Sequence, residues 1–260
     1  RRVSWPLLTT VTHFLIFRPR SNMRLTSSTG LTRRAVLLGT LAAGACTRLS
    51  RPADLPLRRF YAATPQSPEQ PPLIFVPGAF GSNLRDTRSG RELWPHSNFA
   101  LLFGRYAPLE LAIDPDRLEP LADHVVAEDL FTDGLGQDFY EQVLKTLEQA
   151  GGFRRRQPGD PIGPRERNYY VYLYDWRLDN VHAAAELHTF IERIRADYGD
   201  PRLQVDIMAH SNGGLLARYY ARYGQIPLPE SGSPAPLDPG APAIRRLLLV
   251  GSPNLGTIQP

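Results

Sequence analysis

The sequence predicts an α/β fold in which a mostly parallel sheet carries helices on both faces. The run Leu73–Val76 consists of four bulky apolar residues stopped by Pro77-Gly78, which is typical of a strand that is buried on both sides, and three further runs are candidate strands. Segments with apolar residues at helical spacing alternate with these runs, and this alternation indicates βαβ units. The predicted strands are Leu73–Val76, Tyr169–Leu173, Leu203–Met208 and Leu247–Val250.

Three helices are expected between these strands. The first has its apolar face at Phe139, Val143, Leu144 and Leu147, the second at Leu187, Phe190, Ile191, Ile194 and Tyr198, and a shorter third covers Gly213–Tyr223. Residues 83–133 instead show no regular period and are broken by prolines. We interpret this stretch as an irregular excursion over the sheet that forms a cap or lid.

The first part of the chain has the features of a targeting signal. Met23 is the first plausible initiator, so residues 1–22 are expected to be upstream translation. Residues 23–46 carry an Arg33-Arg34 pair before an apolar run that is too short to span a bilayer, as in a twin-arginine export signal. Cys46 follows small residues, as in a lipobox, and would be lipidated; an ordinary export signal cleaved near a cysteine is the alternative. Residues 47–71 have a linker composition.

Composition excludes several classes of function for the domain that we expect at 72–260. The chain has 260 residues with a formal net charge of +4 and a single cysteine. One cysteine excludes an internal disulfide framework and a cysteine-based metal cluster. No nucleic-acid motif accompanies the basic residues, and no metal or organic cofactor is indicated.

The export signal and Cys46 predict the location of the protein. It is expected in the cell envelope, as a lipoprotein, or outside the cell, as a secreted protein.

The segment Ile207–Gly214 is the most informative one for chemistry. It places Ser211 between Ala209 and Gly213, as in the G-x-S-x-G turn that joins a strand to a helix and exposes a nucleophilic serine. Small residues at 209 and 213 allow this strained turn to pack against its neighbours. We predict that Ser211 is the nucleophile; a turn without chemistry is the alternative. His210 is excluded as its base, because adjacent side chains at a strand end point apart, and is expected to support the elbow.

An oxyanion hole requires two N–H donors. The first is predicted to be the backbone of Asn212, directly after the nucleophile. The second is expected from the loop after the first strand, Pro77–Gly81, with Ala79 as our choice and Phe80 as the alternative. Taken without the elbow, this loop would be read as a plain strand-exit turn.

Five segments together resemble the lecithin:cholesterol acyltransferase family, which includes lysosomal phospholipase A2 and phospholipid:diacylglycerol acyltransferase. They agree in order and spacing over residues 71–257, and Tyr174-Asp175-Trp176-Arg177 is the most specific match. The other segments are Pro72–Leu84, Leu93-Trp94-Pro95, Ala209–Gly214 and Gly251–Gly256.

The resemblance implies an α/β-hydrolase, and the lipid anchor expected at Cys46 would place it at a membrane surface. Such an enzyme moves a fatty acyl group from a phospholipid through an acyl-serine to an alcohol, such as a sterol or diacylglycerol, or to water. It carries over Ser211 as the nucleophile and Ala79 and Asn212 as the oxyanion donors. Trp94 and Trp176 become candidates for contact with the acyl chain or headgroup.

Two departures from the family accompany this resemblance. The lid disulfide of the family cannot form, because Cys46 is alone. The fold's order of catalytic residues is Ser, Asp, His, yet no His follows Ser211, and Asp238 lies too early, in a proline-rich loop. We therefore expect the fold to be incomplete at its C-terminus, with the acid and base in missing residues.

Alternatives remain for the motif and for the function. The Tyr174–Arg177 segment could instead be a strand end held by an Asp175–Arg177 contact. A lipase, phospholipase or esterase that uses water would need the same residues as a lipid O-acyltransferase. A hypothesis of another class is a non-catalytic, truncated exported lipoprotein.

Overall fold

The computed structural model describes residues 70–95, 107–116, 119–121, 123–134, 137–138, 140–226 and 240–256, together with Arg59. The expectations for upstream translation, the export signal, Cys46 and nearly all of the linker lie outside these residues. Asp238 and Phe139 also lie outside them.

A five-stranded sheet with the order β10-β9-β1-β8-β7 forms the centre of the fold, and all of its pairings are parallel. Its strands are β1 (Leu73–Val76), β7 (Arg154–Arg156), β8 (Asn168–Val171), β9 (Val205–His210) and β10 (Ile244–Val250). Because parallel strands end at one edge, the segments after β1, β8, β9 and β10 all start from the same side of the sheet. The predicted α/β class is thus confirmed.

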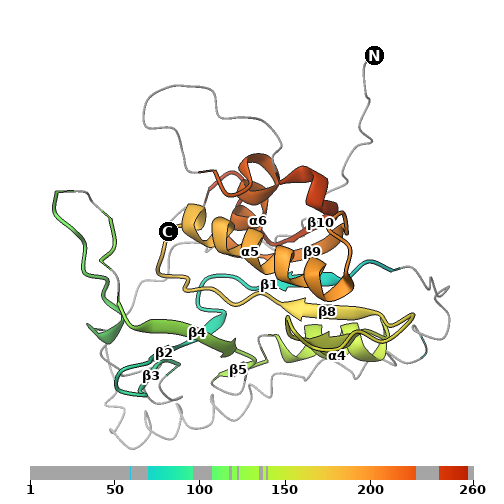
Figure 1. Ribbon diagram of the computed structural model, residues 1–260. Helices are drawn as coiled ribbons and strands as arrows, with labels where there is room; N and C mark the ends of the chain where they lie inside the picture. Colours follow the sequence, from blue (N-terminus) through green and yellow to red (C-terminus); the bar gives the residue numbers. More distant parts are fainter. Residues whose placement is uncertain are drawn as a thin grey trace, which may run out of the picture. The chain divides into compact units, whose positions relative to one another are not determined.

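Helices cover both faces of this sheet, as predicted (Figure 1). Alternate residues of β1 face opposite sides, as the two-residue period of a strand requires. Ile74 and Val76 pack with α5 (Asn180–Tyr198) and α6 (Asn212–Tyr223), whereas Leu73 and Phe75 pack with residues of α4 (Glu141–Gln149) or at its start.

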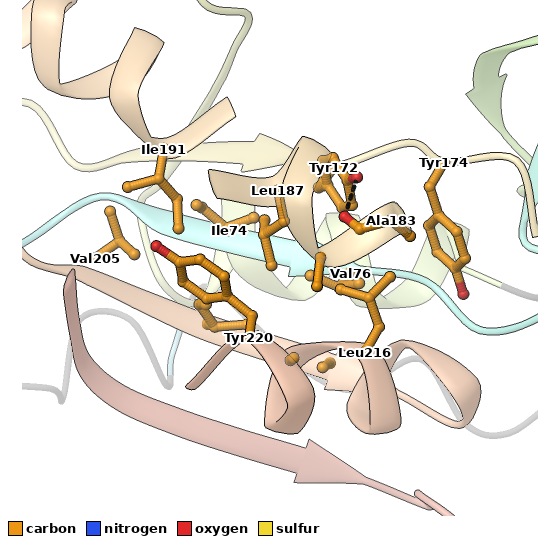
Figure 2. Close-up of a cluster of buried hydrophobic side chains, with 14 of the residues drawn as sticks. Ile74, Val76, Tyr172, Tyr174, Ala183, Leu187, Ile191, Val205, Leu216 and Tyr220 are labelled. Carbon is orange, nitrogen blue, oxygen red and sulfur yellow. Dashed lines mark hydrogen bonds between the residues drawn. The ribbon is translucent and has the colours of Figure 1, made fainter. Parts of the chain in front are cut away.

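The larger core cluster lies under α5 and α6 (Figure 2). Leu187, Ile191 and Ile194 are fully buried there, on the face of α5 that the sequence predicts. Asp179 caps the start of α5 by accepting hydrogen bonds from the N–H groups of residues 181 and 182, and Gly199 ends the helix with φ of 62°. This packing holds α6, and hence the start of that helix, against the strand ends.

The stretch 83–133 departs from its prediction as irregular chain. Its described residues form a three-stranded antiparallel sheet with the order β3-β2-β4. The strands are β2 (Ser82–Asp86), β3 (Glu92–Trp94) and β4 (Val125–Leu130), and a short helix η1 covers Ala107–Leu109. Sequence patterns do not mark these strands, because β3 has only three residues and the apolar residues of β4 are interrupted by the exposed Glu128 and Asp129.

The remaining elements are small. β5 (Asp133–Gly134) pairs with β6 (Gln137–Asp138), and η2 covers Ala241–Ala243 before β10. The sequence also gives no signal for strand β7, because its three arginines carry no strand pattern. Among the described helices, none combines the length and the apolar character needed to cross a bilayer.

Candidate active site

Ser211 lies at a sharp turn between β9 and α6, as the predicted elbow requires. Its backbone has φ of 52° and ψ of −123°, in a region that side-chain-bearing residues rarely adopt. The turn is pinned on its strand side, because the Ser211 N–H donates to Val250 O at 3.0 Å. On its helix side, the Gly214 N–H donates to Ser211 O, also at 3.0 Å. A strained serine held this firmly by its surroundings is typical of functional sites.

Two glycines allow the elbow to approach the loop after β1. A Cβ atom at Gly213 would lie 2.3 Å from Pro77 O and 2.8 Å from Val76 O. A Cβ at Gly78 would lie 2.9 Å from the Ser211 Cβ atom. The structure therefore brings the predicted nucleophile and the predicted oxyanion loop into direct contact, with no room for a methyl group between them.

Most backbone N–H and C=O groups of the loop Pro77–Gly81 have hydrogen-bond partners. Tyr174 Oη donates to Pro77 O, Gly81 N–H donates to Gly78 O, and Trp94 Nε1–H donates to Phe80 O. Gly81 O accepts a bond from the Phe131 N–H, and the Gly78 N–H donates to Tyr140 Oη.

Within the described residues, the N–H groups of Ala79 and Phe80 donate to no partner, and both residues are exposed. Since backbone N–H groups are normally paired, these two are the donors that the loop leaves available. They are the two residues that the sequence offered as the second oxyanion donor.

Asn212 is the first residue of α6, where backbone N–H groups have no partner within the helix. Its backbone N–H likewise donates to no described residue, so the donor predicted after the nucleophile is available. The side chain is held separately, by reciprocal amide hydrogen bonds of 3.1 Å with Asn180. The α6 N-terminus also favours negative charge on an oxygen near Ser211.

Tyr174 ties the loop to the elbow. Its hydroxyl donates to Pro77 O at 3.1 Å and accepts from Asn212 Nδ2 at 3.2 Å. The side chain is fully buried, and burial raises the pKa of the Tyr174 hydroxyl to about 12. Tyr174 thus has a structural role in joining both halves of the candidate site.

Three aromatic rings meet beside the loop. Phe80 is 52% exposed and packs against Trp176 at 4.4 Å and Trp94 at 5.2 Å between ring centroids. The two indole N–H groups point to backbone carbonyls, from Trp94 to Phe80 and from Trp176 to Ser82. The predicted substrate residues Trp94 and Trp176 therefore also brace the chain that follows β1, and Phe80 gives their cluster an exposed apolar surface.

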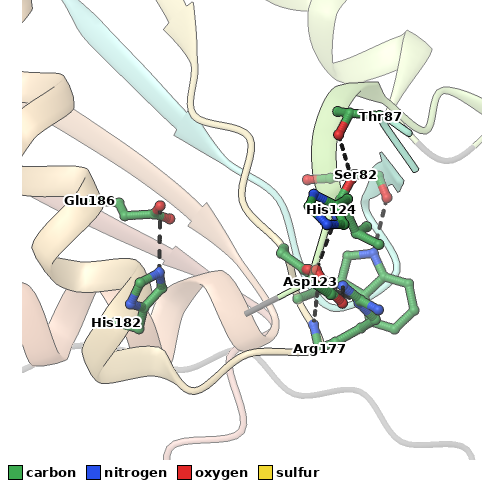
Figure 3. A network of polar contacts seen from close by, with 10 residues as sticks. Ser82, Thr87, Asp123, His124, Arg177, His182 and Glu186 are labelled. Atoms are coloured by element: carbon green, nitrogen blue, oxygen red, sulfur yellow. Dashed lines mark hydrogen bonds and ion pairs between the residues drawn. The ribbon is translucent and has the colours of Figure 1, made fainter. Parts of the chain in front are cut away.

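Asp175 and Arg177 form the ion pair that was the structural alternative for their motif. Arg177 donates to both carboxylate oxygens of Asp175, and its Nη2 also reaches Asp123 at 2.8 Å (Figure 3). The side chain of Arg177 is only 4% exposed. These contacts connect the segment after β8 to the segment that enters β4. In the same view, His182 pairs with Glu186 on the exposed side of α5.

No general base contacts Ser211 within the described residues. Its hydroxyl has no described hydrogen-bond partner, and the ring of His210 is engaged elsewhere, through a 2.9 Å contact between Nδ1 and Tyr140 Oη. Burial lowers the pKa of His210, which favours the neutral ring. The described residues also hold no group of three or more His, Cys, Asp or Glu side chains suited to a metal ion.

Sequence reasoning missed Tyr140 as a member of this site. Its hydroxyl reaches the Gly78 N–H from a position 62 residues along the chain. No local pattern marks such a residue, because its role depends on where the start of α4 meets the end of β1.

Comparison with known proteins adds little to this geometry. No protein-family model matches the chain, and no curated protein matches it. A solved structure, the Tle4–Tli4 complex, contains a similar chain with 19% identity and a TM-score of 0.30. The match covers 59% of this chain and 42% of that one.

Proposed function

We propose that this protein is a serine-dependent acyl-transfer enzyme of the α/β-hydrolase type that acts on lipid esters. One observation carries the proposal: a serine in a strained turn at a helix N-terminus touches a loop in which the N–H groups of the exposed residues Ala79 and Phe80 have no partner among the described residues. A hydroxyl in this position can attack an ester carbonyl, while the amides of Asn212 and Ala79 stabilise the oxyanion that forms.

The lipid substrate is the finer part of the proposal. Support comes from the exposed Phe80 ring and the tryptophans beneath it, which offer an apolar surface next to the loop. The resemblance in sequence favours a phospholipid as the acyl donor and an alcohol, such as a sterol or diacylglycerol, as the acceptor. Hydrolysis by water is the second candidate, since the acceptor is chosen by pocket shape and water exclusion.

Labelling with a fluorophosphonate probe tests the nucleophile in the full-length protein. We expect stoichiometric labelling that Ser211→Ala abolishes, while the matched variant Ser252→Ala, on the loop after β10, is labelled like the wild type. Equal labelling of Ser211→Ala and wild type would remove Ser211 from the mechanism.

The acceptor is tested with a phospholipid that carries a labelled acyl chain, supplied with and without sterol or diacylglycerol. Acyl ester formed only when the alcohol is present supports transfer. Release of free fatty acid alone, at the same rate with and without alcohol, assigns the protein to the hydrolases.

Export and anchoring at Cys46 are proposed on the sequence alone. Metabolic labelling with a radioactive fatty acid should mark the wild-type protein and fail with Cys46→Ser. Labelling of both proteins would show that Cys46 is not the lipidated residue.

A further inference from the structure

Tyr140 brings a buried hydroxyl to the candidate oxyanion loop from the face of the sheet that lies opposite α5 and α6. The residue precedes α4 and is 6% exposed. Its ring packs edge-on against Phe75 of β1, with centroids 5.2 Å apart, and against His210, with centroids 5.6 Å apart. The absence of a side chain at Gly81 allows the ring to approach the loop, because a Cβ there would lie 3.1 Å from the Tyr140 Cε2 atom.

This hydroxyl has two hydrogen-bond partners. Gly78 N–H can only donate, so Tyr140 Oη accepts at 2.9 Å. His210 Nδ1 also lies at 2.9 Å, and the direction of this second bond depends on the imidazole tautomer: the hydroxyl donates when the ring proton is on Nε2. Burial raises the pKa of Tyr140 and lowers that of His210, in agreement with a neutral pair.

Gly78 needs an external anchor for a physical reason. Its lack of a Cβ is required by the Ser211 Cβ, which would lie 2.9 Å away from one. Glycine is also the residue with the greatest backbone freedom, so hydrogen bonds hold the Gly78 backbone: its N–H donates to Tyr140 Oη, and its carbonyl accepts from the Gly81 N–H. The Ala79 N–H belongs to the peptide that directly follows Gly78, so its direction depends on how Gly78 is held.

We propose that Tyr140 is a positioning residue, which fixes the Gly78 backbone so that the Ala79 N–H serves the oxyanion while the Gly78 N–H is withheld from it. The inference rests on the proposed function of Ser211 and adds the residue that sets its oxyanion loop. Tyr140 touches neither the substrate nor the nucleophile's hydroxyl in this role. It acts through Gly78, and it couples the loop to the elbow through His210.

The test is Tyr140→Phe in the full-length protein, with Tyr172→Phe as the matched control. Tyr172 is also buried and donates a single hydrogen bond to Ala183 O at 2.7 Å, away from the loop. The readout is fluorophosphonate labelling of Ser211, resolved into an apparent probe affinity and a maximal rate. For Tyr140→Phe we expect the maximal rate to fall about 10- to 100-fold with the affinity nearly unchanged. Tyr172→Phe should label like the wild type.

Amide hydrogen exchange at Gly78, measured by NMR, separates this inference from the proposed function. Tyr140→Phe should accelerate exchange of the Gly78 N–H at least about tenfold relative to Tyr172→Phe, because a buried bond is lost. Unchanged exchange, unchanged labelling, or equal slowing in both variants would overturn the role of Tyr140. A third outcome is faster Gly78 exchange in Tyr140→Phe together with no labelling of Ser211 in the wild type. This outcome would uphold the anchoring of Gly78 by Tyr140 but overturn the proposed function and its oxyanion.

Discussion

Gly213→Ala should damage both the stability and the reactivity of this protein. The new methyl group would lie 2.3 Å from Pro77 O, whereas an ordinary contact begins near 3.4 Å, so the start of α6 must move by about 1 Å from β1. Overpacking of this kind costs about 3 kcal/mol at the upper end of its usual range, and the better helix propensity of alanine returns up to about 1 kcal/mol.

The net loss of about 2 kcal/mol corresponds to a fall in Tm of about 4–8 °C for a domain of this size. Displacement of the Asn212 N–H by about 1 Å should also slow fluorophosphonate labelling of Ser211 about 100-fold. Differential scanning calorimetry and labelling kinetics on the full-length protein measure the two effects separately.

Gly214 provides the matched control for this substitution. A methyl group there would lie 1.8 Å from Ser252 Oγ and 2.7 Å from Ser252 Cβ, which are side-chain atoms that a second substitution can remove. Gly214→Ala combined with Ser252→Gly should therefore recover the stability and labelling that Gly214→Ala loses. No side-chain substitution can rescue Gly213→Ala, because the obstacles include the carbonyl oxygens of Val76 and Pro77. A Gly213→Ala protein with wild-type Tm and labelling rate would refute the contact.

Four further predictions follow from the contacts of the site. Ser211→Gly should be about 1–2 kcal/mol more stable than Ser211→Ala in urea unfolding, because glycine relieves the strain at φ of 52°; equal stabilities would show that the turn is unstrained. Tyr174→Phe leaves a buried carbonyl without its donor and should cost about 1–3 kcal/mol in the same assay. Arg177→Met leaves the Asp175 carboxylate buried without its partner and should cost about 3 kcal/mol; a loss below about 0.5 kcal/mol would place this pair among ordinary surface pairs. Burial lowers the pKa of His210, so its contribution to stability is complete above its unfolded pKa of about 6.5 and is lost as pH falls through the lowered folded value. The Tm of His210→Asn should therefore fall less than the Tm of the wild type between pH 7 and pH 5. Equal falls in Tm would contradict the lowered pKa.

Local patterns were sufficient for strands β1, β8, β9 and β10 of the central sheet and for the helices that cover it. The run Leu73–Val76 marks a strand buried on both sides, because such burial demands continuous apolar residues. The periodic apolar face of α5 marks a helix that is buried on one side. Local patterns failed for β4, whose apolar residues are interrupted by exposed acidic ones, and for β7, which consists of three arginines. Such strands form because neighbouring strands are present to pair with them, and the pattern of their own residues does not predict them.

The candidate site was likewise predictable only in part from the sequence. The order of small residues around Ser211 predicts a turn between strand and helix, since few sequences can adopt such a backbone. Which N–H groups stay free in the loop could only be decided by accounting for all of its bonds, and the donors and acceptors come from Trp94, Phe131, Tyr140 and Tyr174. The sequence narrowed the second oxyanion donor to Ala79 or Phe80, and neither N–H group has a partner in the part of the chain that the structure describes.

The sequence by itself determined the α/β class, the central strands and the residue at the turn, because each depends on short-range patterns of burial and backbone freedom. Only the tertiary structure decided that the turn touches the loop after β1 and that tyrosines from two faces of the sheet hold this loop. The reason is physical: parallel strands distant in sequence end at one edge, and contacts made there depend on packing between segments that share no local signal.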